Sequence, residues 1–203
     1  VPVDFTSECS EDIPSSMAVA VDNCGSVTIV VTEETTQGIC AGNYTITRTF
    51  TAMDDCGNAS SASQLINVID TTAPVFTDVP SDYTAECSDV HPMDEATATD
   101  NCGEVSITVE NVTTLGSCAG AYTITRVFRA SDDCGNTSTA IQTITIVDTT
   151  APVLSIPADY SAECSDVHPM DDASATDNCG EVTITVESIS TLGACSGEYT
   201  ITR

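Results

Sequence analysis

Apolar and polar residues alternate with a period of two in several short segments of the chain. Val105, Ile107 and Val109 alternate with polar residues, and the same pattern returns at residues 27–31 and 182–186. Such alternation indicates β-strands with one buried face, and abundant Val, Ile and Thr suit a pleated surface. No segment has helical periodicity of useful length. The pattern therefore predicts an all-β chain.

Glycine, proline, aspartate and asparagine separate the apolar segments of residues 73–150, which predicts a series of short strands joined by turns. The expected strands cover roughly residues 75–87, 95–99, 104–113, 112–116, 121–131 and 138–147. This many short strands in one unit fits an immunoglobulin-like β-sandwich better than a closed barrel.

The sequence is an internal repeat with a period of about 78 residues. Four cysteines of the first repeat recur in the second, three recur in the third, and the motifs DNCG and YTITR recur with them. We expect repeats at 1–72, 73–150 and 151–203. The first repeat begins in mid-repeat and the third ends in mid-repeat, so we expect the polypeptide to continue on both sides. The cysteines, in chain order, are Cys9, Cys24, Cys40 and Cys56, then Cys87, Cys102, Cys118 and Cys134, then Cys164, Cys179 and Cys195.

Regularly spaced cysteines in small repeats predict a disulfide framework and an oxidising, extracellular location. Zinc sites use close cysteine pairs, which these wide spacings lack. Four cysteines allow three pairings. Cys118 and Cys134 flank the expected strand 121–131, whose length of about 35–40 Å is far beyond the ~7 Å that a disulfide allows between Cα atoms. That pairing is excluded.

The ends of an immunoglobulin-like sandwich choose between the remaining pairings. The first and third cysteines fall in turns at one end of the sandwich, and the second and fourth fall in loops at the other end. We therefore expect two disulfides within each repeat and leave Cys179 without a partner in this sequence. The expected pairs are Cys9–Cys40, Cys24–Cys56, Cys87–Cys118, Cys102–Cys134 and Cys164–Cys195.

Charge excludes several classes of function. The chain has 31 acidic residues against four basic ones, for a formal net charge of −27. Nucleic-acid binding requires clustered cations, so it is excluded. The residues show no Ser-His-Asp or Cys-His constellation, and we expect no enzyme activity. No segment predicts insertion into a membrane.

Acidic loops are expected to meet where one repeat ends and the next begins. Strands end at Asp70 and Asp148, next to the DNCG and DDCGN loops of the following repeat. Carboxylate and amide oxygens suit Ca²⁺, so calcium is a candidate cofactor at these junctions. That requires the Asp70 carboxylate to lie within about 8 Å of a neighbouring carboxylate. The alternative is that these residues cap turns and their charges are solvated. The candidate ligands are Asp70, Asp100, Asn101, Asp132, Asp133 and Asn136 at the first junction, and Asp148 and Asp177 at the second.

Three motifs carry a family resemblance that covers the whole sequence: DTTAP, ATATDNCG and YTITRVFRASDDCGNTSTA. They resemble the HYR-like (hyalin-type) repeats of Bacteroidetes cell-surface adhesins, including the large gliding-motility adhesins exported by the type IX system. The resemblance implies immunoglobulin-like modules on an extracellular cell surface, in long chains that bind solid substrata or polysaccharide. It also implies O-glycan attachment at Thr71 and Thr149, which follow aspartate in the DTT segments.

Two functions remain open at this stage. The repeats are either a structural stalk or filament, with neighbouring repeats as their partners, or modules that each bind a glycan or surface. Sugar-binding sites generally use exposed aromatic platforms. The chain has no tryptophan and 4% aromatic residues, which favours the stalk.

Overall fold

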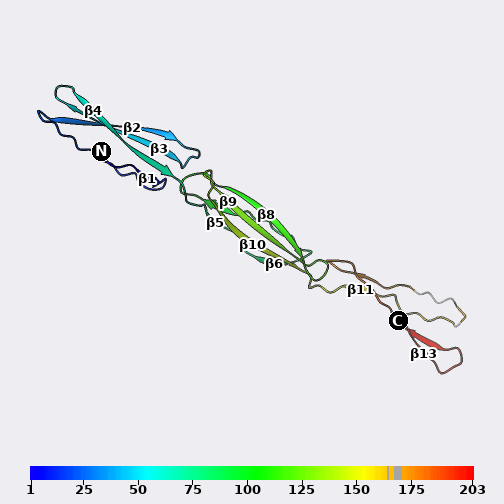
Figure 1. Ribbon diagram of the computed structural model, residues 1–203. Coiled ribbons are helices and arrows are strands. Elements are labelled where there is room, and N and C mark those ends of the chain that lie inside the picture. The colour runs from blue at the N-terminus through cyan, green and yellow to red at the C-terminus, as the bar shows by residue number, and fades with distance from the viewer. Residues whose placement is uncertain (164, 167–170) are drawn as a thin grey trace. The chain divides into compact units, whose positions relative to one another are not determined.

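The computed structural model describes residues 1–163, 165–166 and 171–203. Every regular element in these residues is a β-strand, as Figure 1 shows. The prediction of an all-β, immunoglobulin-like chain is confirmed. The described residues contain no helix with the length and hydrophobicity needed to cross a bilayer.

The first repeat forms one four-stranded sheet in the order β1-β4-β3-β2. The long strands β2, β3 and β4 are antiparallel neighbours, and the short β1 pairs parallel with the end of β4. Gln37 pairs with Tyr44 at one end of the β2–β3 ladder and Val27 pairs with Asp54 at the other. The strands are β1 (Phe5–Glu8), β2 (Val27–Gln37), β3 (Tyr44–Asp54) and β4 (Ala59–Ile69).

The second repeat has the same sheet, in the order β6-β10-β9-β8, and a second sheet formed by β5 and β7. The strand expected at 75–87 is two strands. Its first part pairs with β7 and its second part pairs parallel with β10, because the intervening Pro80 cannot donate to a ladder. The separate strand expected at 112–116 is the end of β8, which corrects that prediction. The strands are β5 (Val75–Asp78), β6 (Tyr83–Glu86), β7 (Thr97–Thr99), β8 (Ser106–Leu115), β9 (Tyr122–Ser131) and β10 (Thr137–Val147).

The third repeat contributes two short antiparallel pairs. Val153 pairs with Thr176 in the first, and Leu192 pairs with Tyr199 in the second. The strands are β11 (Val153–Ser155), β12 (Ser174–Thr176), β13 (Ile189–Leu192) and β14 (Tyr199–Thr202).

Alternate residues of the central strands form the core. Ile46, Ile66 and Val68 form a buried cluster in the first repeat, and Phe128 and Ile144 are fully buried in the second. This burial is the expected result of the period-two pattern, because successive side chains of a strand point to opposite faces.

A buried arginine interrupts each of these apolar faces. Arg48 on β3 pairs in register with Gln64 on β4, and its guanidinium donates to the Gln64 side chain at 3.4 Å. Gln64 in turn donates to the Val3 carbonyl at 2.6 Å. Arg126 and Gln142 repeat the arrangement in the second repeat. A buried polar pair is stable here because each partner satisfies the other.

Contacts divide the chain into two compact units. Unit 1 comprises Val1–Ser81, Met93–Asn111 and Arg126–Gln142, and unit 2 comprises Asp82–Pro92, Val112–Thr125 and Thr143–Arg203. The units do not coincide with the repeats of the sequence. Unit 1 contains the meeting point of the first and second repeats, and unit 2 contains that of the second and third.

Candidate functional site: the junctions between repeats

The three disulfides of the described residues all join consecutive repeats. In unit 1, Cys9 bonds to Cys102 and Cys40 bonds to Cys134, with Cα atoms 6.0 and 5.1 Å apart. In unit 2, Cys87 bonds to Cys179, with Cα atoms 5.8 Å apart. The first cysteine of a repeat thus bonds to the second cysteine of the next, and the third bonds to the fourth of the next.

This pairing corrects the four intra-repeat bonds expected between described cysteines: Cys9–Cys40, Cys24–Cys56, Cys87–Cys118 and Cys102–Cys134. The first and third cysteines of the first repeat do lie at the same end of its sheet, as expected. Cys9 follows β1 and donates its N–H to Ile69 at the end of β4, and Cys40 lies in the turn between β2 and β3 at that same end. They bond to cysteines in the loops of the next repeat, which lie opposite them, and not to each other. The expected bond Cys164–Cys195 falls outside the described residues at Cys164, and Cys179 has a partner after all.

Each junction disulfide closes a loop of more than 90 residues. On the chain-entropy model, a loop of that length stabilises the folded state by roughly 4–5 kcal/mol, and overlapping loops are not additive. The junction is therefore a covalent part of the fold in an oxidising environment.

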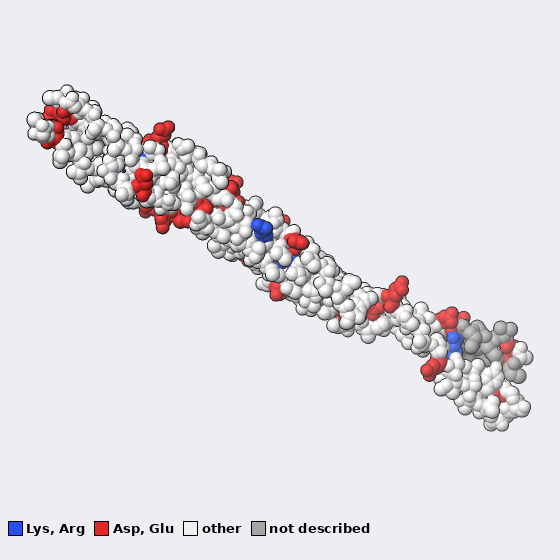
Figure 2. All heavy atoms as spheres, in the orientation of Figure 1, with Lys and Arg blue, Asp and Glu red and all other residues white. Residues whose placement is uncertain are grey.

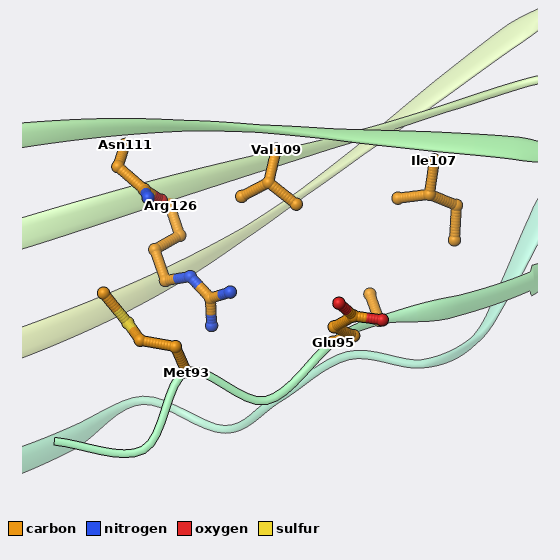
Figure 3. A pocket seen from close by; sticks show the side chains of 7 residues that line it. Met93, Glu95, Ile107, Val109, Asn111 and Arg126 are labelled. Carbon is orange, nitrogen blue, oxygen red and sulfur yellow. The ribbon is translucent and has the colours of Figure 1, made fainter.

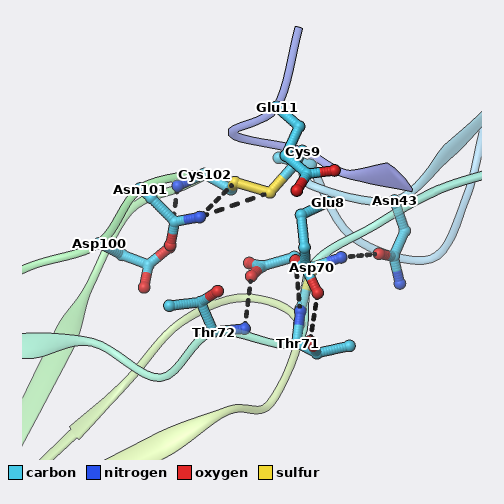
Figure 4. The surroundings of a disulfide bond; sticks show 12 residues. Glu8, Cys9, Glu11, Asn43, Asp70, Thr71, Thr72, Asp100, Asn101 and Cys102 are labelled. Carbon is cyan, nitrogen blue, oxygen red and sulfur yellow. Dashed lines mark hydrogen bonds between the residues drawn. A yellow bond between two sulfur atoms is a disulfide. The ribbon is translucent and has the colours of Figure 1, made fainter. Parts of the chain in front are cut away.

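We define the first junction as Cys9, Cys40 and Asp70 of the first repeat with Asp100, Cys102, Asp132 and Cys134 of the second, all in unit 1. Its centre is the Asp70 carboxylate, which lies beside the Cys9–Cys102 disulfide (Figure 4). Asp70, Asp100 and Asp132 each place one carboxylate oxygen within 4.8 Å of the others. This is well inside the ~8 Å that bridging by one calcium ion requires.

The three carboxylates are partly satisfied by the protein. Asp70 is 5% exposed, and its Oδ1 accepts from Thr72 N at 3.1 Å while its Oδ2 is buried without a partner. Asp100 accepts from Cys102 N at 2.9 Å through Oδ1, and its Oδ2 is also buried without a partner. Asp132 accepts from Asn136 at 2.8 and 2.9 Å. Asp70 Oδ2 and Asp100 Oδ2 are therefore both buried without a protein donor.

Burial, opposed by the hydrogen bond from Thr72, raises the pKa of Asp70, and the negative charges of Asp100 and Asp132 raise it further. A buried carboxylate beside two others is unfavourable as an anion unless a proton or a cation compensates it. The cluster thus carries negative charge that the protein's own hydrogen-bond donors compensate only in part.

The other predicted ligands of the first junction lie around this cluster. Asn136 donates to the Asp70 carbonyl at 3.2 Å and so links the two repeats. Asp133 accepts from Ala41 N across the junction at 2.8 Å. Asn101 directs its amide nitrogen to Cys102 Sγ at 3.1 Å, as Figure 4 shows. Asp133 and Asn101 therefore act as hydrogen-bonding partners of the junction in this structure.

The second junction, in unit 2, repeats the arrangement with Cys87, Asp148, Asp177 and Cys179. Asp148 and Asp177 each place a carboxylate oxygen within 4.8 Å of the other and of the Cys179 sulfur. Asp177 accepts from Cys179 N at 2.8 Å, as Asp100 does from Cys102. The same local chemistry recurs because the same DNCG sequence recurs.

Thr71 and Thr149, the expected glycan acceptors, are exposed but engaged. The Thr71 hydroxyl donates to Glu8 and the Thr149 hydroxyl donates to Glu86, and the backbone N–H of each threonine donates to the same glutamate at 3.2 Å. These bonds hold the DTT segment against the strand that precedes each junction. Glycan attachment at the two hydroxyls stays a prediction.

A pocket of about 290 Å³ lies in unit 1 beside Arg126 (Figure 3). Arg126 donates to the Asp94 carbonyl and to Gln142, both at 2.8 Å, but its buried Nε has no partner. In the first repeat, the equivalent Arg48 Nε binds Glu33 at 2.6 Å. Asn111 occupies the position of Glu33 here, so the second repeat lacks this ion pair. In the sequence, Arg126 alternates in phase with Ile124 and Phe128, and this pattern indicates that its side chain lies on the buried face of the strand.

Acidic side chains on the visible face form separate groups, and basic side chains are rare (Figure 2). Of the four basic residues, Arg48 and Arg126 are buried. The surface is therefore anionic. In the part of the chain that the structure describes, no lysine or arginine donates a hydrogen bond to the junction carboxylates.

Comparison with known proteins identifies the first repeat. Residues 2–68 match the family model of the HYR-like domain with 4 cysteines. Residues 2–68 therefore have the sequence pattern of an HYR-like domain. The match confirms, for residues 2–68, the resemblance to HYR-like repeats inferred from the motifs, and the motifs DNCG and YTITR recur in the second and third repeats. No curated protein matches the sequence.

Solved structures with some similarity include three cadherin-type chains. Protocadherin gamma B2 extracellular domains 1–5 match with a TM-score of 0.35 and 16% identity, over 98% of this chain and 51% of that chain. Drosophila N-cadherin EC1–4 matches with a TM-score of 0.32 and 12% identity, over 71% of this chain and 48% of that chain. Human CDH23 EC21–23 matches with a TM-score of 0.33 and 20% identity, over 68% of this chain and 55% of that chain. The chain spans about half the length of these solved chains. No property of those proteins transfers to it at such low similarity.

Proposed function

We propose that this chain is a series of structural repeats in an extracellular bacterial surface adhesin, and that its junctions transmit mechanical load between repeats. The observation that carries the proposal is that each disulfide of the described residues joins two consecutive repeats. The HYR-like match supports an extracellular, adhesion-type repeat.

The chemistry of the first junction suits a load-bearing role. A short linker around Thr71 and Thr72 joins the repeats, and two disulfides run parallel to it. Hydrogen bonds from Asn136 to Asp70 and from Ala41 to Asp133 lie beside them. A force that separates the repeats must therefore act against covalent bonds as well as against packing.

The motif resemblance supports the finer part of the proposal. On this basis the parent is a cell-surface adhesin for gliding motility or attachment, exported by the type IX system, whose binding to a solid substratum or polysaccharide resides elsewhere in the protein. The repeats themselves are non-catalytic. Their direct partners are the neighbouring repeats.

Attachment of whole cells under flow tests the proposal. Removing both disulfides of the first junction, with Cys9→Ser and Cys102→Ser together with Cys40→Ser and Cys134→Ser, should lower the shear stress at which cells detach. The amount of protein on the surface should stay unchanged. Glu34→Gln, an exposed change on β2, is the matched control. Unchanged detachment in the variant without disulfides would contradict the load-bearing role.

A glycan array with the purified chain tests the alternative that each repeat is itself a binding module. The proposal expects no reproducible binding, because the chain lacks tryptophan and has few aromatic residues to stack on sugars. Reproducible binding to one glycan class would overturn the purely structural role.

The junction carboxylates support a second proposal, a divalent cation such as Ca²⁺ held by Asp70, Asp100 and Asp132, with a similar site at Asp148 and Asp177. Its support is the convergence of three carboxylates and the two buried oxygens without donors. Oxygen-only ligands match calcium. Such an ion would neutralise charge that the protein leaves uncompensated.

Thermal unfolding with calcium or with a chelator tests the cation. Calcium at a hundred times its dissociation constant should stabilise the folded chain by about 2.7 kcal/mol. Asp70→Asn should remove most of this gain, whereas Asp78→Asn, an exposed change on β5, should retain it. Identical melting of the parent chain with calcium and with chelator would exclude the site.

A further inference from the structure

The four free cysteines of the described residues occupy defined positions in the repeat. Cys24 and Cys56 are the second and fourth cysteines of the first repeat, and Cys118 and Cys195 are the third cysteines of the second and third repeats. All four are exposed. In the paired junctions, second and fourth cysteines bond backwards to the preceding repeat, and third cysteines bond forwards to the following one.

We propose that Cys24, Cys56, Cys118 and Cys195 are junction cysteines, each of which bonds to a cysteine of an adjoining repeat of the same kind. Cys56 would bond to a third cysteine, Cys24 to a first cysteine, and Cys118 and Cys195 to fourth cysteines. Every junction then carries the same two disulfides. The inference rests on the proposed function in that it extends the same covalent series.

The loops that carry Cys24 and Cys56 already have the geometry of a closed junction. Cys24 N donates to Asp22 at 3.0 Å, as Cys102 N does to Asp100 at 2.9 Å. Asn58 donates to Asp54 at 2.8 and 2.7 Å, as Asn136 does to Asp132 at 2.8 and 2.9 Å. These loops adopt this form with both thiols free. The two thiols are therefore presented in the conformation that accepts one.

The loop that carries Cys118 lies against the third repeat within unit 2. Gly120 has φ +81°, and a Cβ placed on it would lie 2.7 Å from Cys179 Cβ. Only glycine adopts this conformation readily and allows such an approach. In the first junction the equivalent turn, with Cys40, lies beside the fourth cysteine of the next repeat. The third repeat of this sequence has three cysteines, so the fourth cysteine that Cys118 requires is not among them.

Formation of each disulfide is a two-electron oxidation, and a small disulfide such as oxidised glutathione can accept the two electrons. One junction thiolate attacks the oxidant disulfide and gives a mixed disulfide, with release of one oxidant thiol. The second junction thiolate then attacks the mixed disulfide at the junction sulfur. This attack releases the second oxidant thiol, so the products are the junction disulfide and two oxidant thiols, which carry both electrons and both protons.

Oxidation of the purified chain with oxidised glutathione tests the proposal. A third repeat of one copy can precede the first repeat of another, so we expect reducible multimers linked through Cys195 and Cys56. Non-reducing digestion and mass spectrometry should find this peptide pair together with the three bonds already formed. Cys56→Ser should abolish the Cys195 cross-link, whereas Cys24→Ser should retain it.

Several results would overturn the inference: a bond between Cys24 and Cys56, a bond between Cys118 and Cys195, or four thiols that stay free under oxidant. A disulfide map of the intact parent protein is the second measurement and does not depend on how the isolated chain assembles. There, any bond between two cysteines of one repeat would contradict the proposal. Glycan binding, which would overturn the structural role, leaves this map unchanged.

Discussion

The disulfide pattern predicts how far the chain can be stretched. If the three bonds are intact, the shortest covalent path from Val1 to Arg203 includes only residues 1–9, 87–102 and 179–203. These are about 50 residues. Fully extended, and including the two disulfides through which the path runs, they span about 180 Å. The reduced chain of 203 residues spans about 700 Å. Reduction should therefore release roughly 500 Å.

Single-molecule force spectroscopy with reductant added during the measurement gives both lengths, after the free thiols have been capped. Two variants sharpen the test. Removing Cys9 and Cys102 as Cys9→Ser and Cys102→Ser forces the path through Cys40–Cys134, which lengthens the oxidised chain to about 400 Å. Cys40→Ser with Cys134→Ser should leave it unchanged, because that bond is not on the shortest path.

Pairing within repeats gives a different result. Bonds between the first and third cysteine of each repeat would let the oxidised parent chain extend to about 400 Å. That length, or equal effects of the two double variants, would refute the inter-repeat pairing.

Three further predictions concern single residues. Burial raises the pKa of Asp70 above its ordinary value of 3.8. Without calcium, the Asp70 charge therefore destabilises the folded state at neutral pH. This destabilisation decreases as the pH falls through the raised pKa, and it is gone below 3.8. Asp70→Asn should thus melt above the parent chain at pH 7, and the difference in Tm should shrink on acidification; a constant difference would contradict this. Asn111→Glu should restore the partner that Arg126 Nε lacks and raise stability by about 0.5–1 kcal/mol in urea unfolding, while Glu33→Asn should lower it in the first repeat. Gly120→Ala should lower the free energy of unfolding by more than the roughly 1 kcal/mol expected of Gly135→Ala, because both glycines have positive φ but only Gly120 lies against Cys179. Equal urea midpoints for the two variants would contradict the contact between Gly120 and Cys179.

The sequence predicts the strands well because burial on one face of a sheet leaves a direct trace in the order of residues. Residues 27–31 lie in β2 and residues 106–109 lie in β8, as the alternation predicts. The same pattern at residues 182–186 is not a strand in the structure, where the next strand of the third repeat is β13 (Ile189–Leu192), so that prediction was wrong. The split between β5 and β6 leaves a weaker trace, since only Pro80 marks the point where the chain passes from one sheet to the other.

The junction could be predicted only in part. Placing Asp70 near Asp100 and Asp132 required the assumption that consecutive repeats meet end to end, and the three carboxylates do converge. The same assumption places Cys9 opposite Cys102, but spacing alone cannot distinguish a partner in the same repeat from one in the next. The repeat period makes the two choices equivalent in sequence. Only the positions of the loops on either side of the junction distinguish them.

The overlap of the Cys9–Cys102 and Cys40–Cys134 loops has a consequence for survival outside the cell. A protease that cuts the backbone once between residues 41 and 101, for example in the exposed segment at Thr71 and Thr72, produces two pieces that remain bonded through both disulfides. The damaged molecule keeps its continuity. A cell that depends on such a chain would tolerate nicks in this stretch that would sever an ordinary polypeptide.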